Sequence, residues 1–536
     1  MFKIINTKPY KDQIPGTSGL RKKVSVFMQE NYLENFIQSI FNSIDCKGAT
    51  LVLGGDGRYY NNVAIQKILK IAAANGCAKI ILAKDGLLST PAASYLIRLY
   101  KADGGIILSA SHNPGGINHD FGVKYNIYTG SAAPSSFTSK VYEQSLNITK
   151  YKIVDSKDID LSVIGHQNLC GMDIEIIDPV KDYADYMEQI FEFDIIADAI
   201  KSWLRFKFNA MNAITGPYAI EIFHNRLGVP KEYLENTTPL EDFGGIHPDP
   251  LPENLPDMFQ EFLSPNADFV LGAACDGDGD RNLIIGKGHF VTPSDSLAIL
   301  LSYIDYLPYY AGKCYGVARS LPTGRAVDAV AKCKGIPLYE TPTGWKYFGN
   351  LLDSKKITLC GEESFGAGSL HAREKDGIWA VLFWLNIIAR TKKSIGDILQ
   401  DHWREYGRCY FARYDFEGLP ENKAKLFIDN LRNNISHLQS KNENIAKAEE
   451  FNYTDPVDNS YSKGQGIIIT LKTGARIVYR LSGTGTSGAT LRVYIDHITE
   501  DYNLAKDTVV DPIYKIALDV SELKFILQRE QADNIV

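Results

Sequence analysis

Three times along this chain, an apolar run that predicts a β-strand ends in a polar loop that contains glycine. The three pairs of strand and loop are residues 106–108 with 109–116, 269–273 with 276–281, and 357–360 with 361–366. Helical patterns alternate with the strands, which predicts α/β units built on parallel sheets. Because ligands of such sheets bind at the carboxyl ends of strands, we expect the three loops to face one cleft.

The pattern changes after about Tyr410. A polar helical segment at 423–433 is followed by short alternating runs typical of strands, which predicts a smaller α+β domain. The Asn/Lys-rich stretch 440–447 is expected to be an exposed loop. We place domain boundaries near Asp182, Pro293 and Gly407. The predicted domains are residues 1–182, 183–293, 294–407 and 408–536.

Asp276, Asp278 and Asp280 alternate with two glycines, and Arg281 follows at once. The glycines permit a sharp turn that brings the carboxylates together. A bound divalent cation relieves their repulsion, and oxygen ligands suit Mg²⁺, Ca²⁺ or Mn²⁺. An EF-hand loop is excluded, because its sixth and twelfth positions hold Arg281 and Lys287 in place of Gly and Glu. A solvated acidic turn is the alternative, but such a turn does not require strict alternation after a buried strand.

Composition excludes several classes of protein. The 536 residues are 45% hydrophobic and 23% charged, as in an ordinary globular protein. A net charge of −7 argues against general binding to nucleic acid or membrane surfaces. The 8 cysteines form no CxxC pair, which fits a reducing compartment. The most apolar stretch, 378–389, is too short to span a membrane and predicts a buried helix. The N-terminus lacks a signal-peptide pattern, so we expect a cytoplasmic protein. No obligate protein partner is evident from the sequence.

Ser111 follows the buried run 106–108 and precedes a Pro/Gly-rich turn, which leaves its hydroxyl accessible. His112 is adjacent in sequence, so its side chain is expected to point elsewhere. A serine that faces a metal site favours phosphoryl transfer over acyl transfer, because a divalent cation neutralises phosphoryl oxygens. A serine in a turn is more often structural, however, and the residues alone leave both interpretations open.

Near the C-terminus, Arg480 and Arg492 flank a segment rich in Gly, Ser and Thr. Exposed backbone N–H groups, hydroxyls and arginines together predict a phosphate site, although no P-loop motif is present. A flexible turn is the alternative, which the flanking arginines disfavour. Glu362 and Ser364 are able to hydrogen-bond sugar hydroxyls or are only solvated. The charged run 373–377 is open to the same two interpretations.

These segments together resemble the α-D-phosphohexomutase superfamily, and most closely its phosphoglucomutase branch. The segments that support the resemblance span nearly the whole chain in family order: 15–21, 109–116, 275–281, 361–366, 373–377 and 480–492. The form Gly-Glu-Glu-Ser-Phe-Gly at 361–366 is similar to the glucose-preferring branch. The resemblance implies an α/β fold of four domains around a central cleft, with three related α/β domains and a smaller α+β C-terminal domain.

The resemblance also implies roles for individual residues. Ser111 is the expected phosphorylated nucleophile, Lys124 the acid/base residue, and Arg281 a support for the phosphoserine. Mg²⁺ is expected on Ser111, Asp276, Asp278 and Asp280. The expected substrate-binding residues are Arg21 and Arg58 in the first domain, Thr343, Gly344, Glu362, Ser364 and Lys375 at the sugar, and Arg480, Ser482, Thr484 and Arg492 at the non-reacting phosphate. A lone lysine is usually a solvated charge, so the role of Lys124 rests on the resemblance.

Three segments depart from the family pattern. Ile117-Asn118-His119 replaces Pro-Asn-Gly after the serine loop, and residues 209–213 read Asn-Ala-Met-Asn-Ala where relatives have Asp-Ala-Met-His-Gly. Leu370 replaces an acidic residue before His371. These differences concern the shape of two loops and contacts with the sugar, and not the catalytic set.

The resemblance implies an enzyme, an intramolecular phosphotransferase of the isomerase class, that interconverts glucose 1-phosphate and glucose 6-phosphate. Phosphorylated Ser111 is expected to act through glucose 1,6-bisphosphate, which serves as intermediate and activator. One alternative is a phosphosugar-binding protein without turnover. Another is a mutase that acts on mannose or pentose phosphates, since one sequence does not measure a preference between sugars.

Overall fold

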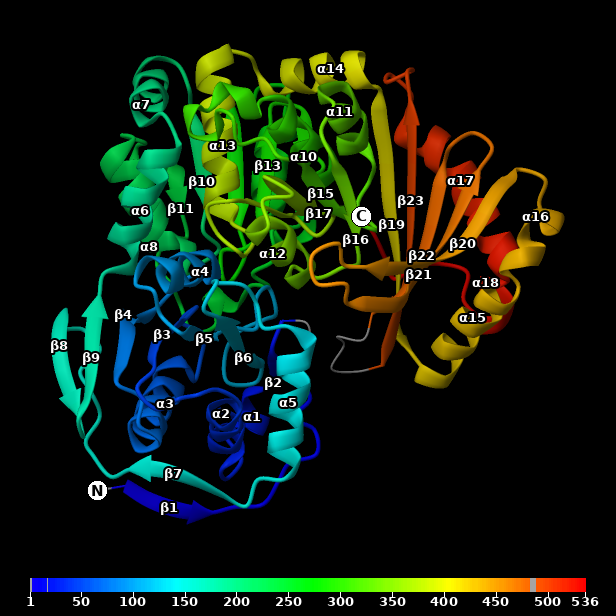
Figure 1. Ribbon diagram of the computed structural model, residues 1–536. Helices are drawn as coiled ribbons and strands as arrows, with labels where there is room; N and C mark the ends of the chain where they lie inside the picture. The colour runs from blue at the N-terminus through cyan, green and yellow to red at the C-terminus, as the bar shows by residue number, and fades with distance from the viewer. Residues whose placement is uncertain (1, 17, 483–487) are drawn as a thin grey trace. The chain divides into compact units, whose positions relative to one another are not determined.

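The computed structural model describes residues 2–16, 18–482 and 488–536. The chain divides into two compact units (Figure 1). The first comprises Met1–Val291, Asp305–Gly312 and Phe365–Gly396; the second comprises Thr292–Ile304, Lys313–Ser364 and Asp397–Val536. Within the described residues, no helix is both long and apolar enough to cross a membrane.

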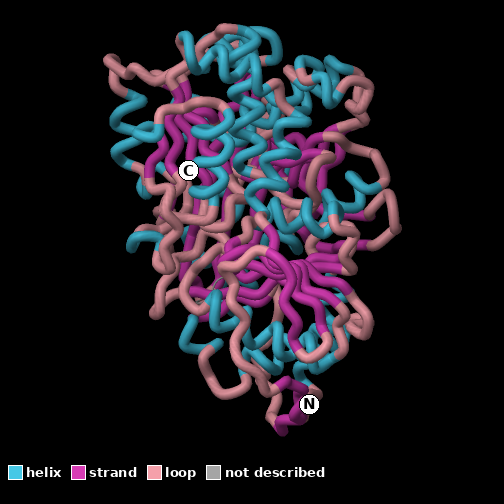
Figure 2. Tube along the Cα trace, turned by 90° about the vertical axis from the view of Figure 1, so that its left-hand side faces the viewer, coloured by secondary structure: helices cyan, strands magenta, loops and turns pink. Residues whose placement is uncertain are grey.

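The first unit contains a seven-stranded sheet with the order β2-β6-β5-β3-β4-β9-β8. Its strands are β2 (Leu20–Lys23), β3 (Thr50–Gly55), β4 (Lys79–Leu87), β5 (Gly104–Leu108), β6 (Asp120–Ile127), β8 (Gly165–Leu169) and β9 (Met172–Ile177). The central strands β5, β3, β4 and β9 are parallel. Their near-continuous apolar runs are explained by helices on both faces. The strands fan out with the twist expected of such a sheet (Figure 2).

Alternate residues of each strand face opposite sides of this sheet. Leu51 and Leu53 join a core with α2 (Tyr32–Ser43) and α3 (Asn61–Asn75). On the other face lies α4 (Thr90–Leu99), visible above the strands in Figure 1. The short antiparallel pair β1 (Phe2–Asn6) and β7 (Lys150–Val154) lies outside this sheet.

A second sheet of the first unit has the order β11-β10-β12-β13-β14. Its strands are β10 (Phe206–Asn209), β11 (Leu234–Glu235), β12 (Leu271–Cys275), β13 (Asn282–Gly286) and β14 (His289–Val291). The helix α13 (Gly377–Thr391) packs on β12 and β13, and every residue from Gly377 to Ala389 is buried. The buried helix predicted at 378–389 is therefore confirmed.

The second unit contains the parallel strands β15 (Val317–Ser320), β16 (Leu338–Thr341) and β17 (Leu359–Glu362). It also contains an antiparallel sheet with the order β20-β21-β22-β23-β19-β24. The long strands of that sheet are β19 (Arg408–Leu419), β20 (Ile445–Thr454), β21 (Tyr461–Leu471), β22 (Arg476–Ser482) and β23 (Ala489–Thr499). The helices α15 (Glu421–Asn433), α17 (Lys506–Ser521) and α18 (Leu523–Leu527) cover one face of it (Figure 1).

Two local expectations differ from the structure. The stretch 440–447 is not a continuous exposed loop, because α16 (Leu438–Lys441) enters it and β20 begins at the buried Ile445. The sequence pattern at 217–227 predicts one α-helix, whereas the structure has α8 (Thr215–Ala219) followed by a π-helical turn over Ile220–Arg226. In both places, packing against neighbouring elements overrides the local pattern of polar and apolar residues.

Candidate active site

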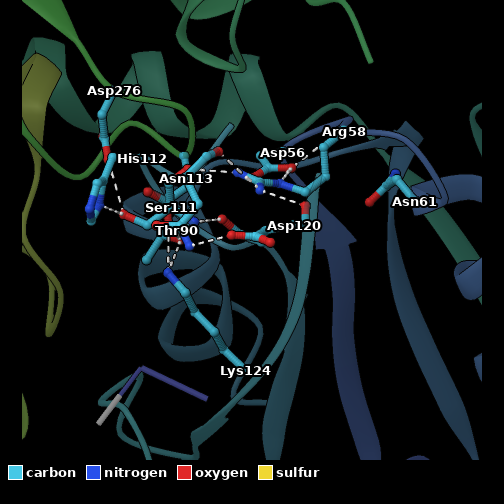
Figure 3. Close-up of polar contacts among 12 residues, drawn as sticks. Asp56, Arg58, Asn61, Thr90, Ser111, His112, Asn113, Asp120, Lys124 and Asp276 are labelled. Carbon is cyan, nitrogen blue, oxygen red and sulfur yellow. Dashed lines mark hydrogen bonds and ion pairs between the residues drawn. The ribbon is translucent and has the colours of Figure 1, made fainter. Parts of the chain in front are cut away.

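Ser111 lies just beyond the carboxyl end of β5 and is buried. Its backbone is left-handed, with φ of 54°, a conformation that is costly for a residue other than glycine. The Ser111 N–H donates to Ser109 Oγ at 2.7 Å, and Arg58 Nη2 donates to the Ser111 carbonyl at 2.6 Å. These contacts fix the direction of the hydroxyl (Figure 3).

The predicted aspartate turn follows β12 and approaches Ser111 closely. The Ser111 hydroxyl donates to Asp276 Oδ2 at 3.1 Å (Figure 3). Gly277 permits this approach, because a Cβ there would lie 2.5 Å from the Ser111 carbonyl oxygen. Gly279 has φ of 78°, the left-handed conformation that turns the chain between Asp278 and Asp280. The loops after β5 and β12 therefore meet, as the sequence predicts.

Asp276, Asp278 and Asp280 are all buried, and one oxygen of each lies within 4.8 Å of the others. Asp276 Oδ1 accepts the N–H groups of Asp280 and Arg281 at 2.9 and 3.0 Å. Asp278 Oδ1 and Asp280 Oδ1 are buried without a hydrogen-bond partner. Clustered carboxylate oxygens without donors suit a hard divalent cation, so the residues fit the predicted metal site.

Burial, together with the neighbouring Asp280 and Asp278 carboxylates, raises the pKa of Asp276 well above its usual value. Asp278 differs: burial also opposes its charge, but Lys124 and Thr90 outweigh that effect and lower its pKa. Lys124, on β6, donates from Nζ to Asp278 Oδ2 at 2.5 Å (Lys124 appears in Figure 3). The predicted acid/base lysine thus contacts the predicted metal cluster.

Three other predicted cations of the first unit surround this cluster. Lys375 Nζ lies 3.1 Å from Asp280 Oδ2, and Arg281 Nη1 donates to Asp249 at 2.9 Å. Burial lowers the pKa of Arg21, while Asp278 and Asp280 raise it, which places its charge near both carboxylates. The positive groups offset the three negative charges and provide partners for a phosphate.

Arg58 has a different environment from that of an exposed ligand-binding residue. Its side chain is fully buried and paired with Asp56 at 2.9 Å. Its Nη1 donates to the carbonyl groups of Asn113 and Asp120, at 3.3 and 2.9 Å, in addition to the Nη2 contact with Ser111. These contacts shape the serine loop, so Arg58 acts on the site through the backbone (Figure 3).

The predicted residues of the second unit form two groups. Glu362, at the end of β17, accepts the Gly344 N–H at 2.9 Å. Thr343 precedes Gly344, and its hydroxyl oxygen is buried and has no hydrogen-bond partner among the described residues. Ser364 is partly exposed just beyond β17. The loops after β16 and β17 are thus linked by Glu362, across β15, which lies between these two parallel strands; the carboxyl ends of all three strands meet at one edge of the sheet.

Arg480 and Arg492 are direct cross-strand partners on β22 and β23. Arg492 Nε lies 3.5 Å from Asp415, and Arg413 also pairs with Asp415, at 3.1 Å. Ser482 ends β22, whereas Thr484 lies outside the described residues. Arg413 was not predicted as a site residue. What points to it is structural, because it lies on β19, the strand that pairs with β23 and its Arg492.

Four family models match the chain in order. Their descriptions are phosphoglucomutase/phosphomannomutase alpha/beta/alpha domain I at residues 12–152, domain II at 181–288, domain III at 293–406, and phosphoglucomutase-1 C-terminal domain at 408–533. A phosphoglucomutase of Rhizobium radiobacter is 54% identical over 94% of this chain and 93% of the relative. The chain belongs to the phosphoglucomutase family.

Other members of the family are also similar over nearly their full lengths. Human phosphoglucomutase-1 is 47% identical over 98% of each chain. The crystal structure of the open form of the Paramecium phosphoglucomutase pp63/parafusin superposes with a TM-score of 0.93 at 42% identity, and covers 100% of this chain and 99% of that one. The predicted fold class, with three α/β domains followed by a smaller C-terminal domain, is confirmed.

Three residues near the family's serine loop were not predicted as site residues. His112 Nδ1 lies 3.5 Å from Ser111 Oγ, so its ring does not point elsewhere as expected. Thr90 contacts both Lys124 and Asp278, and Asp249 pairs with Arg281. The contacts of Thr90 and Asp249 do not follow from spacing, because their partners are distant in sequence.

Proposed function

We propose that this protein is a phosphoglucomutase that interconverts glucose 1-phosphate and glucose 6-phosphate through a phosphoserine at Ser111 and glucose 1,6-bisphosphate. The observation that supports it best is the 3.1 Å hydrogen bond between the Ser111 hydroxyl and Asp276 of the aspartate cluster. A nucleophile beside a site for a divalent cation is the arrangement that phosphoryl transfer requires.

In the proposed cycle, the P–O bond of phosphorylated Ser111 breaks as a sugar hydroxyl forms a new P–O bond. The hydroxyl proton goes to Lys124 acting as base, the Ser111 oxygen leaves as an alkoxide, and glucose 1,6-bisphosphate results. The bisphosphate then reorients, and its other phosphoryl group returns to Ser111 while Lys124 gives its proton back to the leaving sugar oxygen. Arg281 and Arg21 stabilise the charge of the transferring group.

Asp276, Asp278 and Asp280 would hold Mg²⁺ together with Ser111. The cation, when bound, neutralises the phosphoryl oxygens. Lys375 and Asp280, 3.1 Å apart, orient one another at this site. Burial of the whole cluster excludes water, which would otherwise hydrolyse the phosphoserine.

We assign the other predicted residues to the substrate. Thr343, Gly344, Glu362 and Ser364 would contact sugar hydroxyls, and Arg480, Ser482, Thr484 and Arg492 would bind the non-reacting phosphate. Arg413 joins this last group, because it shares Asp415 with Arg492. The assignment follows the predicted domains, with the nucleophile in 1–182, the metal site in 183–293, the sugar site in 294–407 and the phosphate site in 408–536.

A coupled assay for glucose 6-phosphate tests the proposal. Wild-type protein supplied with glucose 1,6-bisphosphate and Mg²⁺ should convert glucose 1-phosphate, and Ser111→Ala should lose roughly 10³-fold or more of that activity while it stays folded. Full activity in Ser111→Ala would refute the assigned nucleophile. Absence of turnover in primed wild-type protein would favour a phosphosugar-binding protein.

The same assay format addresses the sugar preference. We propose that glucose phosphates are better substrates than mannose or pentose phosphates, because the loop 361–366 has the form of the glucose-preferring branch. Faster turnover of mannose 1-phosphate would overturn this preference. A cytoplasmic location also stays a proposal, which rests on cysteine use and which localisation of the tagged chain would test; some relatives are named chloroplastic.

A further inference from the structure

Thr90 is a fully buried residue that no sequence motif distinguishes. It is the first residue of α4, and the preceding Ser89 caps this helix by accepting the Ala92 N–H at 3.3 Å. The start of α4 follows β4, so Thr90 lies at the same edge of the seven-stranded sheet as Ser111 (Figure 3). Its position brings a hydroxyl to the aspartate turn, a segment almost two hundred residues later in the chain.

Two hydrogen bonds connect Thr90 to Asp278. The Thr90 N–H donates to the Asp278 carbonyl oxygen at 3.0 Å, and the Thr90 hydroxyl donates to Asp278 Oδ2 at 2.6 Å. The first bond fixes the backbone of the turn and the second fixes the carboxylate. With Oδ2 engaged in this way, Asp278 Oδ1 is the oxygen that stays without a hydrogen-bond partner.

The same hydroxyl also contacts Lys124. Lys124 Nζ donates to Thr90 Oγ1 at 3.2 Å and to Asp278 Oδ2 at 2.5 Å. An ammonium group only donates, so the Thr90 oxygen must accept from Lys124 and give its own proton to Asp278. One hydroxyl therefore has a defined orientation between the proposed acid/base residue and a proposed metal ligand.

We infer that Thr90 is a positioning residue that sets the carboxylate of Asp278 for the cation and the amine of Lys124 for proton transfer. The part of the inference that concerns Lys124 and proton transfer rests on the proposed function. The part that concerns Asp278 involves cation binding alone. Partners that orient a metal ligand from outside the coordination shell commonly contribute ten- to hundredfold to metal affinity or activity. No substrate contact is required of Thr90.

Thr90→Val tests the inference, because valine keeps the shape and the backbone N–H bond but removes the hydroxyl. Mn²⁺ binding to metal-free protein, measured by electron paramagnetic resonance, should weaken about tenfold or more. In the coupled assay, kcat should fall about tenfold or more, with KM for glucose 1-phosphate within about twofold of wild type. Thr90→Ser restores the hydroxyl, so it should recover most of the Mn²⁺ affinity and most of kcat.

Thr215→Val is the matched control. Thr215 is a buried threonine whose methyl group faces the same turn, 2.8 Å from the place that a Cβ on Gly279 would take. Its hydroxyl oxygen has no hydrogen-bond partner among the described residues. Thr215→Val should therefore bind Mn²⁺ and turn over like the wild type. If Thr90→Val melts well below this control, Thr90→Ala provides a second hydroxyl-free side chain with the same expectation.

Wild-type Mn²⁺ affinity in a folded hydroxyl-free variant would overturn the inference, and so would a Thr90→Ser protein as impaired as Thr90→Val. The two readouts separate this inference from the proposed function. If the wild type binds Mn²⁺ but converts no sugar phosphate, the proposed function fails, and the change in Mn²⁺ affinity still decides the role of Thr90 at the metal site.

Discussion

At the scale of residues, the conformation of Ser111 depends on a buried ion pair. Arg58 and Asp56 are both fully buried, and Arg58 donates to the Ser111 carbonyl at 2.6 Å. A left-handed serine costs on the order of 1–2 kcal/mol, and such strain persists only where its surroundings fix it. The pair therefore serves the site by holding the backbone that presents the hydroxyl.

Arg58→Met should destabilise the protein by about 3–5 kcal/mol, because it leaves the Asp56 carboxylate buried without its cationic partner. Denaturant unfolding measures the change, and the coupled assay should show loss of turnover even where the variant is folded. The double variant Asp56→Asn/Arg58→Met should recover part of the stability but not the activity. An Arg58→Met protein as stable as the wild type would contradict the account.

Asp295 is another buried residue with a measurable consequence. It lies in α10 (Pro293–Ser302), and burial raises its pKa to about 6. Because an unfolded aspartate titrates near 3.9, the native state binds the extra proton between about pH 4 and pH 6. The contribution of protonated Asp295 to the free energy of unfolding is therefore present at low pH. It falls by roughly 2–3 kcal/mol as pH rises through that window.

Asp295→Asn should remove this slope. Relative to wild type, its melting temperature should be higher at about pH 7.5 and lose that advantage near pH 4. Asp519→Asn, at an exposed position on α17, is the control for the loss of a carboxylate that is not buried. Equal differences at both pH values for Asp295→Asn would show that Asp295 does not hold the proton.

Ser111 and the aspartates were predictable from the polar loops that follow apolar strands, and Lys124 from the resemblance to the family. The rule for strands of one sheet does not explain why they meet, because β5 and β12 belong to two different sheets. Thr90 and Asp249 were not predictable. Threonine at a helix start predicts only a cap, and the contact with Asp278 depends on how two sheets pack. Contacts between distant segments have no local signal.

At the scale of elements, α13 connects the core of the first unit to the aspartate turn. The Gly377 N–H donates to the Gly279 carbonyl at 3.0 Å, and Asp376 caps the helix by accepting the Trp379 N–H at 3.1 Å. A Cβ at Gly377 would lie 2.3 Å from the Arg281 carbonyl oxygen and 2.6 Å from Cys275 Sγ. The absence of a side chain lets the helix start against the turn.

Gly377→Ala should displace the aspartate turn. We expect a loss of about 1–3 kcal/mol from overpacking, together with weaker Mn²⁺ binding. Ala380→Gly, one turn later in the same helix, should cost about 1 kcal/mol through helix propensity and leave Mn²⁺ affinity unchanged. Comparable metal affinity in the two variants would show that the start of α13 does not shape the metal site.

Helices were predictable where a long run of the sequence was either mostly apolar or mostly polar. The apolar run 378–389 gave a buried helix, and α15 was expected within two residues of its observed start at Glu421. The π-helical turn over Ile220–Arg226 was not predictable, because its register depends on tertiary packing and not on periodicity.

At the scale of the whole molecule, a bound cation and the fold should stabilise one another. The aspartate cluster contains three buried carboxylates in the first unit, and a ligand that binds only the folded state raises stability. The cluster is formed by segments that come together only on folding, so metal binding and folding are coupled.

Chelation of divalent cations should abolish turnover, and Mg²⁺ should restore it and raise the melting temperature. Because burial and the neighbouring aspartates raise the pKa of Asp276, protons compete with a cation for this carboxylate more strongly than for an ordinary aspartate. Mn²⁺ affinity should therefore fall as pH is lowered. An affinity that does not change with pH would show that Asp276 binds no proton in the metal-free protein.

The most direct test of the account is a map of where the phosphoryl group resides. Metal-loaded protein is treated with glucose 1,6-bisphosphate, its intact mass is measured, and the modified peptide is sequenced. We predict a gain of one phosphoryl group, located on Ser111. A phosphoryl group on another residue, or none in a protein that turns over, would contradict the account.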